Sequence, residues 1–276
     1  MAFLGYHHQD RPPVPAALVA DIRLELTETG ALPEHGFLLR FFPVFDFQRH
    51  GVAALFCAPA YDAAEAVHGH PAFRDFSPAE WAQIDCAILD HALAFAGALS
   101  RHGIVAAVGA SVGYATLADP RGRIAYREAL REAHAREQSY LVVKIEGIPE
   151  HATAQRMGEL VASLRLVAPR VWAHLPGSRI PLGGQLPLHA SGLVMSMPAR
   201  LPFQGMQGEA RWLARQAMLQ TALACMDTVD SAAELDTVRA AGIRFVAGQA
   251  TGRPALAATA TADDIRDVLY ADLPLR

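Results

Sequence analysis

Eight short apolar runs, many of them rich in β-branched residues, alternate with stretches of helical periodicity, and this alternation most constrains the fold. The runs are apolar along their whole length, which is typical of strands buried on both faces of a parallel sheet. Eight such strands with helices between most of them favour a closed α/β barrel over an open doubly wound sheet. A length of 276 residues suits one such barrel. The expected strands are Phe37–Phe45, Val52–Cys57, Ile104–Ala110, Tyr140–Glu146, Arg170–Leu175, Gly192–Ser196, Thr221–Met226 and Ile243–Ala247.

Start signals predict helices between these runs. Ser77–Glu80 has the spacing of a capping box, with a proline at the first helical position. An apolar stripe over Met157–Leu164 predicts a second helix, and Ser231–Glu234 repeats the capping box before a third. A short helix is also expected over Ala16–Glu28. No glycine-rich phosphate-binding loop follows any of the runs, which further disfavours an open nucleotide-binding sheet.

The composition excludes several classes of protein. With 52% hydrophobic and 19% charged residues, the chain can build one large core and is not a disordered segment. A net charge of −4 gives no electrostatic reason to bind nucleic acid or an anionic membrane. The best candidate for a membrane span, the uncharged run His102–Ala118, is too short. Three widely spaced cysteines form neither a disulfide framework nor a zinc motif, so we expect a soluble protein of the reducing cytoplasm.

Polar residues at the carboxyl ends of the expected strands are the candidate site, because α/β-barrel enzymes build their chemistry there. They are Lys144, Glu146, His174 and Asp227. Lys144, the only lysine in the chain, shares a strand face with Glu146 and can pair with it, and Asp227 is the alternative partner. A neutral, desolvated lysine could instead form a Schiff base. His174 is either a polar contact in the pocket or a structural histidine.

Carboxylates are too sparse along the chain for a divalent-metal centre. Between Glu159 and Asp227 the only acidic residue is Glu209, which lies in an expected helix. Consecutive strands therefore contribute no carboxylate, whereas a magnesium or calcium site needs several converging on the ion. The sequence predicts neither a metal nor another cofactor.

Several segments occur in an order that carries a resemblance to a known family: Phe41–Asp46, Gly51–Cys57, Val108–Ser111, Leu141–Gly147, Val171–Gly177, Met226–Ser231 and Gly242–Pro254, which ends in Gly252-Arg253-Pro254. In this order they resemble the segments of the EAL domain, the α/β barrel that hydrolyses cyclic di-GMP in bacteria. The resemblance covers residues 34–258. It implies a TIM-type (β/α)8 barrel whose first strand runs antiparallel. Residues 1–33 are then an N-terminal extension, and residues 259–276 a C-terminal tail helix.

The resemblance also locates the positions where the family carries its catalytic and ligand-binding residues, and most of them are altered here. Lys144 stands in place of a metal-binding glutamate, and His174 and Leu175 stand in place of paired aspartates. Only Asp227, in place of a glutamate, keeps its chemistry. We therefore expect a degenerate EAL domain with no catalytic residues and no phosphodiesterase activity. The other altered positions are Phe42, Ala53, Cys57, Gly109, Val194, Ser196 and Ala247.

A chain that loses a metal site but keeps its folding signals is expected to act through its surface. The sequence thus predicts a regulatory protein-interaction module of bacterial signalling, which forms a homodimer or binds a protein partner. The expected contact lies within Leu201–Leu219, where Trp212 could alternatively cover the barrel strands. This segment carries residue types found at interface cores, namely Phe203, Met206, Arg211, Trp212 and Arg215.

Two other functions stay open at this point. The first is a receptor that binds cyclic di-GMP without hydrolysing it. Changes at Phe42, Cys57 and Ala247 would each remove contacts of roughly 1.5–3 kcal/mol, so we expect no binding. The second is an unrelated barrel enzyme, a Schiff-base lyase that uses Lys144.

Overall fold

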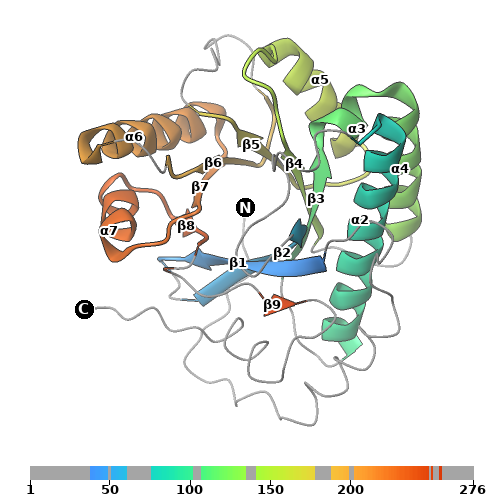
Figure 1. The fold of residues 1–276 in the computed structure, drawn as a ribbon, viewed down its shortest axis with the longest axis horizontal. Coiled ribbons are helices and arrows are strands. Elements are labelled where there is room, and N and C mark those ends of the chain that lie inside the picture. Colours follow the sequence, from blue (N-terminus) through green and yellow to red (C-terminus); the bar gives the residue numbers. More distant parts are fainter. Residues whose placement is uncertain are drawn as a thin grey trace.

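The computed structural model describes residues 38–48, 51–60, 76–101, 107–134, 141–177, 188–198, 202–248, 250 and 255–256. Within them the strands follow the order β2-β3-β4-β5-β6-β7-β8-β1, and β1 also pairs with β2, which closes the sheet into a barrel (Figure 1). Strand β1 (Leu38–Asp46) is antiparallel to β2 (Gly51–Ala60) and β8 (Phe245–Val246). The pairings from β2 through β8 are parallel. The closed barrel and its antiparallel first strand are therefore confirmed.

The remaining elements follow the predicted alternation. The strands between β2 and β8 are β3 (Ala107–Gly113), β4 (Leu141–Glu146), β5 (Val171–Leu175), β6 (Gly192–Ser196) and β7 (Leu223–Asp227). The helices that surround them in Figure 1 are α2 (Pro78–Arg101), α3 (Tyr114–Ala118), α4 (Pro120–His134), α5 (Ala154–Arg165), α6 (Phe203–Gln220) and α7 (Ala232–Ala240). None of these helices is long and apolar enough to cross a membrane.

All eight expected runs form strands, and the differences lie at their ends. The third strand ends three residues later than predicted, because Ser111, Val112 and Gly113 pair with β4, and residues 104–106 lie outside the described residues. A short strand that the sequence did not predict, β9 (Ala255–Leu256), pairs with β1. The expected helix over residues 16–28, the N-terminal extension, the tail helix over residues 259–276 and residues 252–254 lie outside the described residues.

The predicted capping boxes explain where two helices begin. The backbone N–H of Glu80 donates to Ser77 Oγ at 3.3 Å, and the N–H of Ser77 donates to Glu80 Oε2 at 2.7 Å, ahead of α2. Ser231 and Glu234 make the same reciprocal pair ahead of α7. Each box satisfies backbone donors that have no partner in the first helical turn, which fixes the start of the helix.

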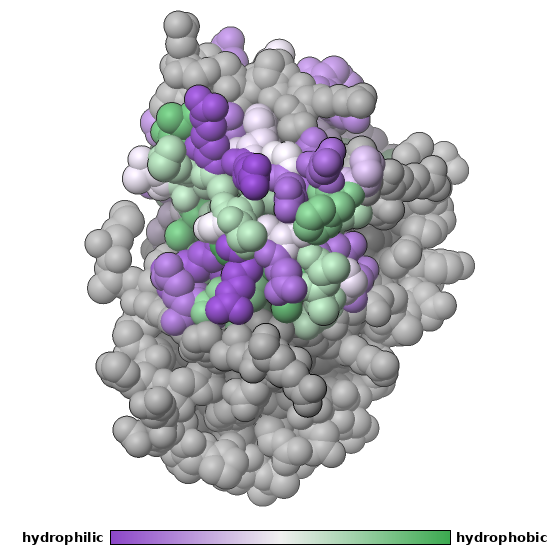
Figure 2. All heavy atoms as spheres, turned by 90° about the vertical axis from the view of Figure 1, so that its left-hand side faces the viewer, coloured by the Kyte–Doolittle hydropathy of each residue, from purple (hydrophilic) through white to green (hydrophobic). Residues whose placement is uncertain are grey.

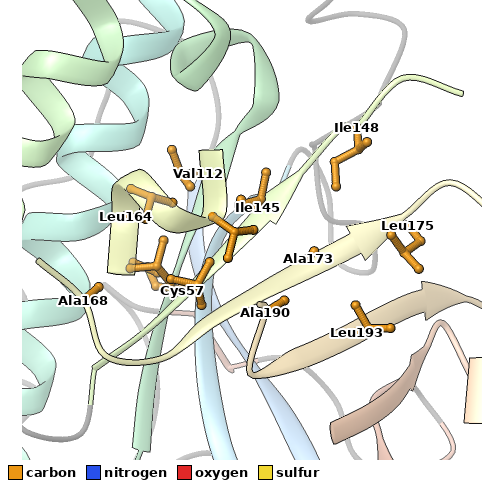
Figure 3. Close-up of a cluster of buried hydrophobic side chains, with 14 of the residues drawn as sticks. Cys57, Val112, Ile145, Ile148, Leu164, Ala168, Ala173, Leu175, Ala190 and Leu193 are labelled. Carbon is orange, nitrogen blue, oxygen red and sulfur yellow. The ribbon is translucent and has the colours of Figure 1, made fainter. Parts of the chain in front are cut away.

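The helices pack on the outer side of the barrel through one large apolar cluster. In Figure 3, Leu164 of α5 lies over Val112 of β3 and Ile145 of β4, and each of the three is fully buried. Leu164 belongs to the predicted stripe of α5, whose buried members are Met157, Leu160, Val161 and Leu164. The helical period therefore aligns one face of α5 with the sheet, which is the packing that the sequence pattern indicates.

A second, smaller cluster fills the inside of the barrel. The ring centroid of Trp172 on β5 lies 5.3 Å from that of Phe56 on β2 and 6.1 Å from that of Phe245 on β8. Two glycines give these rings room, since a Cβ at Gly109 would lie 2.2 Å from Phe56 and one at Gly192 would lie 2.7 Å from Trp172. The barrel therefore has a packed aromatic layer, and polar chemistry is confined to the strand ends beyond it.

Candidate functional site

Four consecutive strands carry polar side chains toward their carboxyl ends. Lys144 and Glu146 lie two residues apart on β4, so both share the inward face that Val142 occupies within the barrel interior. By the same alternation His174 follows the inward-facing Trp172 on β5. The Lys144 Nζ lies 5.1 Å from the centre of the Phe56 ring, so the ammonium rests on the aromatic layer.

Ser196 and Asp227 complete this group from the next two strands. Ser196 is the last residue of β6 and Asp227 the last residue of β7, and the two are direct neighbours in the parallel register. We refer to Lys144, Glu146, His174, Ser196 and Asp227 as the mouth network.

Glu146 is the centre of the mouth network. Its Oε1 forms an ion pair with Lys144 Nζ, and its Oε2 bonds to His174 Nδ1. The other ring nitrogen of the histidine, Nε2, lies 2.9 Å from Ser196 Oγ and 3.6 Å from Asp227 Oδ2. The structure therefore resolves the two partners left open for Lys144 in favour of a direct ion pair with Glu146.

The two carboxylates shift the titration of both cations. Burial opposes the charge on His174, but Glu146 and then Asp227 outweigh it and raise the pKa of the imidazole to about 8. Burial likewise opposes the charge on Lys144, and the same two carboxylates outweigh it and raise the pKa of the ammonium. At pH 7 the network then holds two positive and two negative groups, so its formal charges cancel.

The donor set of the mouth does not suit a divalent cation. The carboxylate with the most buried side chain, that of Glu146 at 6% exposed, already holds an ammonium and an imidazole. Within the described ranges, no group of three or more His, Cys, Asp or Glu side chains is placed to hold a metal ion. An ion bound to Glu146 would also lie beside the Lys144 ammonium, and like charges repel strongly in a poorly hydrated site.

The structure thus brings together all four residues that the sequence analysis singled out at the strand ends, and it adds one. The sequence analysis named Ser196 only as the end of an expected strand and among the altered family positions. Its place next to His174 follows from the pairing of His174 with Val194, which puts Ser196 two residues further on along the neighbouring strand. The signal available in the sequence was an isolated polar residue at the end of an apolar run.

Cys57, one of the altered positions, lies away from the mouth network. Its side chain is fully buried in the cluster under the helices, on the outer side of the barrel (Figure 3). Residues Val44 and Phe45 pair with Ala54 and Val52, so Ala53 has no counterpart on β1 and both alanines contact the interior cluster. After this bulge, the alternation of inward-facing and outward-facing side chains on β2 is shifted by one residue. The Cys57 side chain therefore lies away from the mouth network.

The expected interface residues divide into two sets on α6. Arg211 and Arg215 are exposed, and Phe203 is 55% exposed, whereas Met206 and Trp212 are half-buried and pack against the core beneath the helix. Two further apolar residues of this helix, Met218 and Leu219, are 72% and 59% exposed. Figure 2 views the side of the molecule formed by α6 and α7, where apolar residues occur in separate groups between hydrophilic ones.

Comparison with known proteins identifies the fold. No protein-family model and no curated protein matches the sequence. Solved structures do match: the EAL domain of Xanthomonas citri FimX in complex with c-diGMP is 18% identical, with a TM-score of 0.60 over 86% of this chain and 94% of that one. The EAL domain of Mycobacterium smegmatis DcpA is 14% identical, with a TM-score of 0.61 over 86% of this chain and 99% of that one.

A third structure, Bacillus subtilis YkuI, has an EAL domain and was solved with c-di-GMP as substrate and calcium. It is 14% identical, with a TM-score of 0.61 over 79% of this chain and 55% of that one. The chain therefore has the barrel fold of EAL domains, as the sequence resemblance predicts.

Proposed function

We propose that the chain is a catalytically inactive EAL-like domain that acts as a regulatory protein-interaction module in bacterial signalling related to cyclic di-GMP. The observation that carries this proposal is the mouth network, in which Lys144 and His174 neutralise Glu146 and Asp227. Metal-assisted phosphodiester hydrolysis needs carboxylates that are free to bind the ions. Here the Lys144 ammonium is paired with Glu146, one of the carboxylates that would have to bind an ion.

The first test of this proposal is phosphodiesterase activity. The purified protein is incubated with cyclic di-GMP and magnesium or manganese, and the linear dinucleotide is measured against a heat-denatured sample. We expect no product above the denatured control. Linear product formed by the wild type and lost in Glu146→Gln would overturn the proposal, because it would show that this carboxylate still supports hydrolysis.

Binding of the dinucleotide is a separate question. Cyclic di-GMP carries two phosphate charges, and a mouth network with no net charge attracts an anion only weakly. The FimX EAL domain was solved with c-diGMP bound, which makes a non-hydrolysing receptor the second candidate. Titration calorimetry with cyclic di-GMP decides between them. We expect no heat of binding, and micromolar or tighter binding would move the function to that of a second-messenger receptor.

The exposed face of α6 supports the interaction role. Arg211, Arg215 and Met218 recur at a spacing of four and then three residues, so they lie on one side of the helix, and all three are exposed. Methionine and arginine are enriched at protein interfaces. We therefore expect this side of α6 to contact a second copy of the chain or a protein partner.

Trp212 is a poor site for testing that contact, because it also packs on the core. We therefore choose Met218→Asp, together with Ile124→Asp as a matched control on α4, where Ile124 is 56% exposed. Light scattering is expected to show a dimer for the wild type and for Ile124→Asp and a monomer for Met218→Asp. A wild type that is monomeric and retains no partner in a pull-down contradicts the proposal.

The chemistry of Lys144 weighs against the Schiff-base alternative. An amine attacks a carbonyl only in its neutral form, and the two neighbouring carboxylates raise the pKa of Lys144 rather than lower it. We expect no carbonyl compound to be trapped on Lys144 by borohydride at neutral pH.

A further inference from the structure

Three side chains of the mouth network are joined in an order that matters chemically. Ser196 Oγ lies 2.9 Å from His174 Nε2, and His174 Nδ1 bonds to Glu146 Oε2. A hydroxyl, an imidazole and a carboxylate linked in this order form the relay that activates serine nucleophiles on several unrelated folds. The three residues come from neighbouring strands, β6, β5 and β4, which are rigid supports for such a group.

We propose that Ser196 is a nucleophile toward small activated esters, with His174 as its general base and Glu146 as the group that holds the imidazole. The inactivity proposed above concerns the metal-assisted hydrolysis of phosphodiesters, whereas this reaction needs neither a metal ion nor a phosphodiester.

The reaction balances with water as the only co-reactant. Ser196 Oγ forms a bond to the carbonyl carbon of the ester while its proton passes to His174 Nε2. The bond from that carbon to the leaving oxygen then breaks, and the leaving alcohol takes the proton from the imidazole. Water attacks the acyl group through the same base, which releases a carboxylic acid and restores the serine hydroxyl.

The surrounding charges set the pH at which the base can work. Groups from two strands face His174: Glu146 and Lys144 on β4, and Asp227 on β7. Burial and Lys144 lower the pKa of the imidazole, but the two carboxylates outweigh them and raise it to about 8, and only the neutral ring accepts a proton. Reactivity is therefore expected to rise with pH to a plateau above about 8, a midpoint well above that of an ordinary histidine.

The backbone near Ser196 narrows the class of substrate. The N–H of Met197, the residue after the serine, donates to the carbonyl oxygen of Asp227 at 2.9 Å. This N–H is thus not free to stabilise an oxyanion, a contribution that acyl transfer to a poor leaving group requires. Aryl esters and fluorophosphonates depend less on it, because their leaving groups depart easily. His174 retains 19% of its side-chain exposure, so a small probe can reach the pair from solvent.

The test uses a fluorophosphonate, in which the Ser196 oxygen bonds to phosphorus while fluoride leaves and the proton goes to His174. The wild-type protein is labelled between pH 6 and 10, and the labelled peptide is identified by mass spectrometry. We expect the label on Ser196, with a half-maximal rate near pH 8. His174→Gln is expected to lower the rate by about a hundredfold.

The controls separate a relay from an ordinary exposed serine. Ser163→Ala removes a half-buried hydroxyl on α5, where it donates to the Leu160 carbonyl, and labelling should be unchanged. Heat-denatured wild type should not be labelled at Ser196. The proposal is overturned if native wild type carries no label on Ser196. It is also overturned if the denatured protein is labelled equally well, or if the rate shows no inflection near pH 8. Peptide mapping of the wild type decides the matter even where a variant fails to fold.

Discussion

Replacing Asp85 with asparagine should change the pH dependence of stability more than any other single substitution in α2. Asp85 lies on α2, and its fully buried side chain contacts β3 and α3. Its Oδ2 accepts the backbone N–H of Gly113 at 2.9 Å and the hydroxyl of Thr116 at 2.6 Å. Burial raises the pKa of this carboxyl to about 7, against the smaller lowering effect of the two hydrogen bonds. The folded chain therefore keeps a proton here that the unfolded chain loses near pH 3.8.

The sign and size of the effect follow from that difference. Between about pH 4 and pH 7 the unfolded state binds fewer protons at Asp85 than the folded state, so stability falls as the pH rises. A gap of about three pKa units corresponds to a loss of about 4 kcal/mol once the folded carboxyl is ionised. Asparagine has nearly the same shape and can still accept both hydrogen bonds, but it never ionises. About 1 kcal/mol of this is already lost at pH 4.5, where the unfolded carboxyl is mostly ionised. Between pH 4.5 and pH 8, Asp85→Asn should therefore gain about 3 kcal/mol of stability relative to wild type.

Urea denaturation at pH 4.5 and pH 8 measures this difference. At pH 8 the neighbouring thiol and phenol stay neutral, since the pKa of Cys86 is raised to about 11 and that of Tyr126 well above 10, in both cases chiefly by burial. Groups that titrate alike in both proteins, such as His91, cancel in the comparison. Asp90→Asn, at an exposed position of the same helix, is the control and should show little change. Equal shifts with pH in wild type and Asp85→Asn would refute the reasoning.

Three further substitutions test other parts of the structure. Arg244→Met should lower the free energy of unfolding by about 3 kcal/mol, measured by urea denaturation, because it leaves the 2%-exposed Asp46 side chain without its bidentate guanidinium. Gly109→Ala should destabilise by about 2 kcal/mol through overlap with the Phe56 ring, and the double variant with Phe56→Ala should recover part of that loss. His174→Gln should flatten the stability profile between pH 6.5 and 8. The raised pKa stabilises the folded protein by up to about 2 kcal/mol below pH 6.5, and this is lost as the pH rises through about 8.

The first of these substitutions has a matched control, and the other two have outcomes that would contradict the reasoning. Arg239→Met removes an exposed arginine in the last turn of α7 and should change stability by less than about 0.5 kcal/mol. If Gly109→Ala and Phe56→Ala add without coupling, the close approach of β3 to the Phe56 ring is wrong. Profiles that fall equally between pH 6.5 and 8 in wild type and His174→Gln contradict the charge assigned to His174.

The apolar runs and capping boxes predict most of the fold because they depend on local sequence. A strand buried on both faces is apolar whatever its neighbours are, and a capping box is complete within four residues. β8 is only two residues long, yet Ile243–Ala247 still marks it, because this segment is buried in the closed barrel. β9 was missed because two residues carry no pattern of their own, and only pairing with β1 defines them.

The faces of the strands could not be predicted, since an all-apolar run gives no alternation from which to assign them. The bulge opposite Val44 and Phe45 shows the consequence: Ala53 contacts the interior, and Cys57, four residues later, lies outside the barrel. The contact between His174 and Ser196 was also beyond local sequence. It depends on the stagger between two parallel strands, which the whole closed barrel determines.

The mouth network links the two proposals through one proton. With His174 charged, its positive charge and that of Lys144 cancel the two carboxylates, and the mouth attracts neither a metal ion nor an anionic dinucleotide. With His174 neutral, one carboxylate is left uncompensated and the imidazole can accept the Ser196 proton. Raising the pH through about 8 should therefore start serine labelling without restoring phosphodiester hydrolysis, because Lys144 keeps its charge and stays bound to Glu146. Phosphodiesterase activity that rises together with serine labelling would show instead that the ammonium does not block a metal ion, and the case for inactivity would fail.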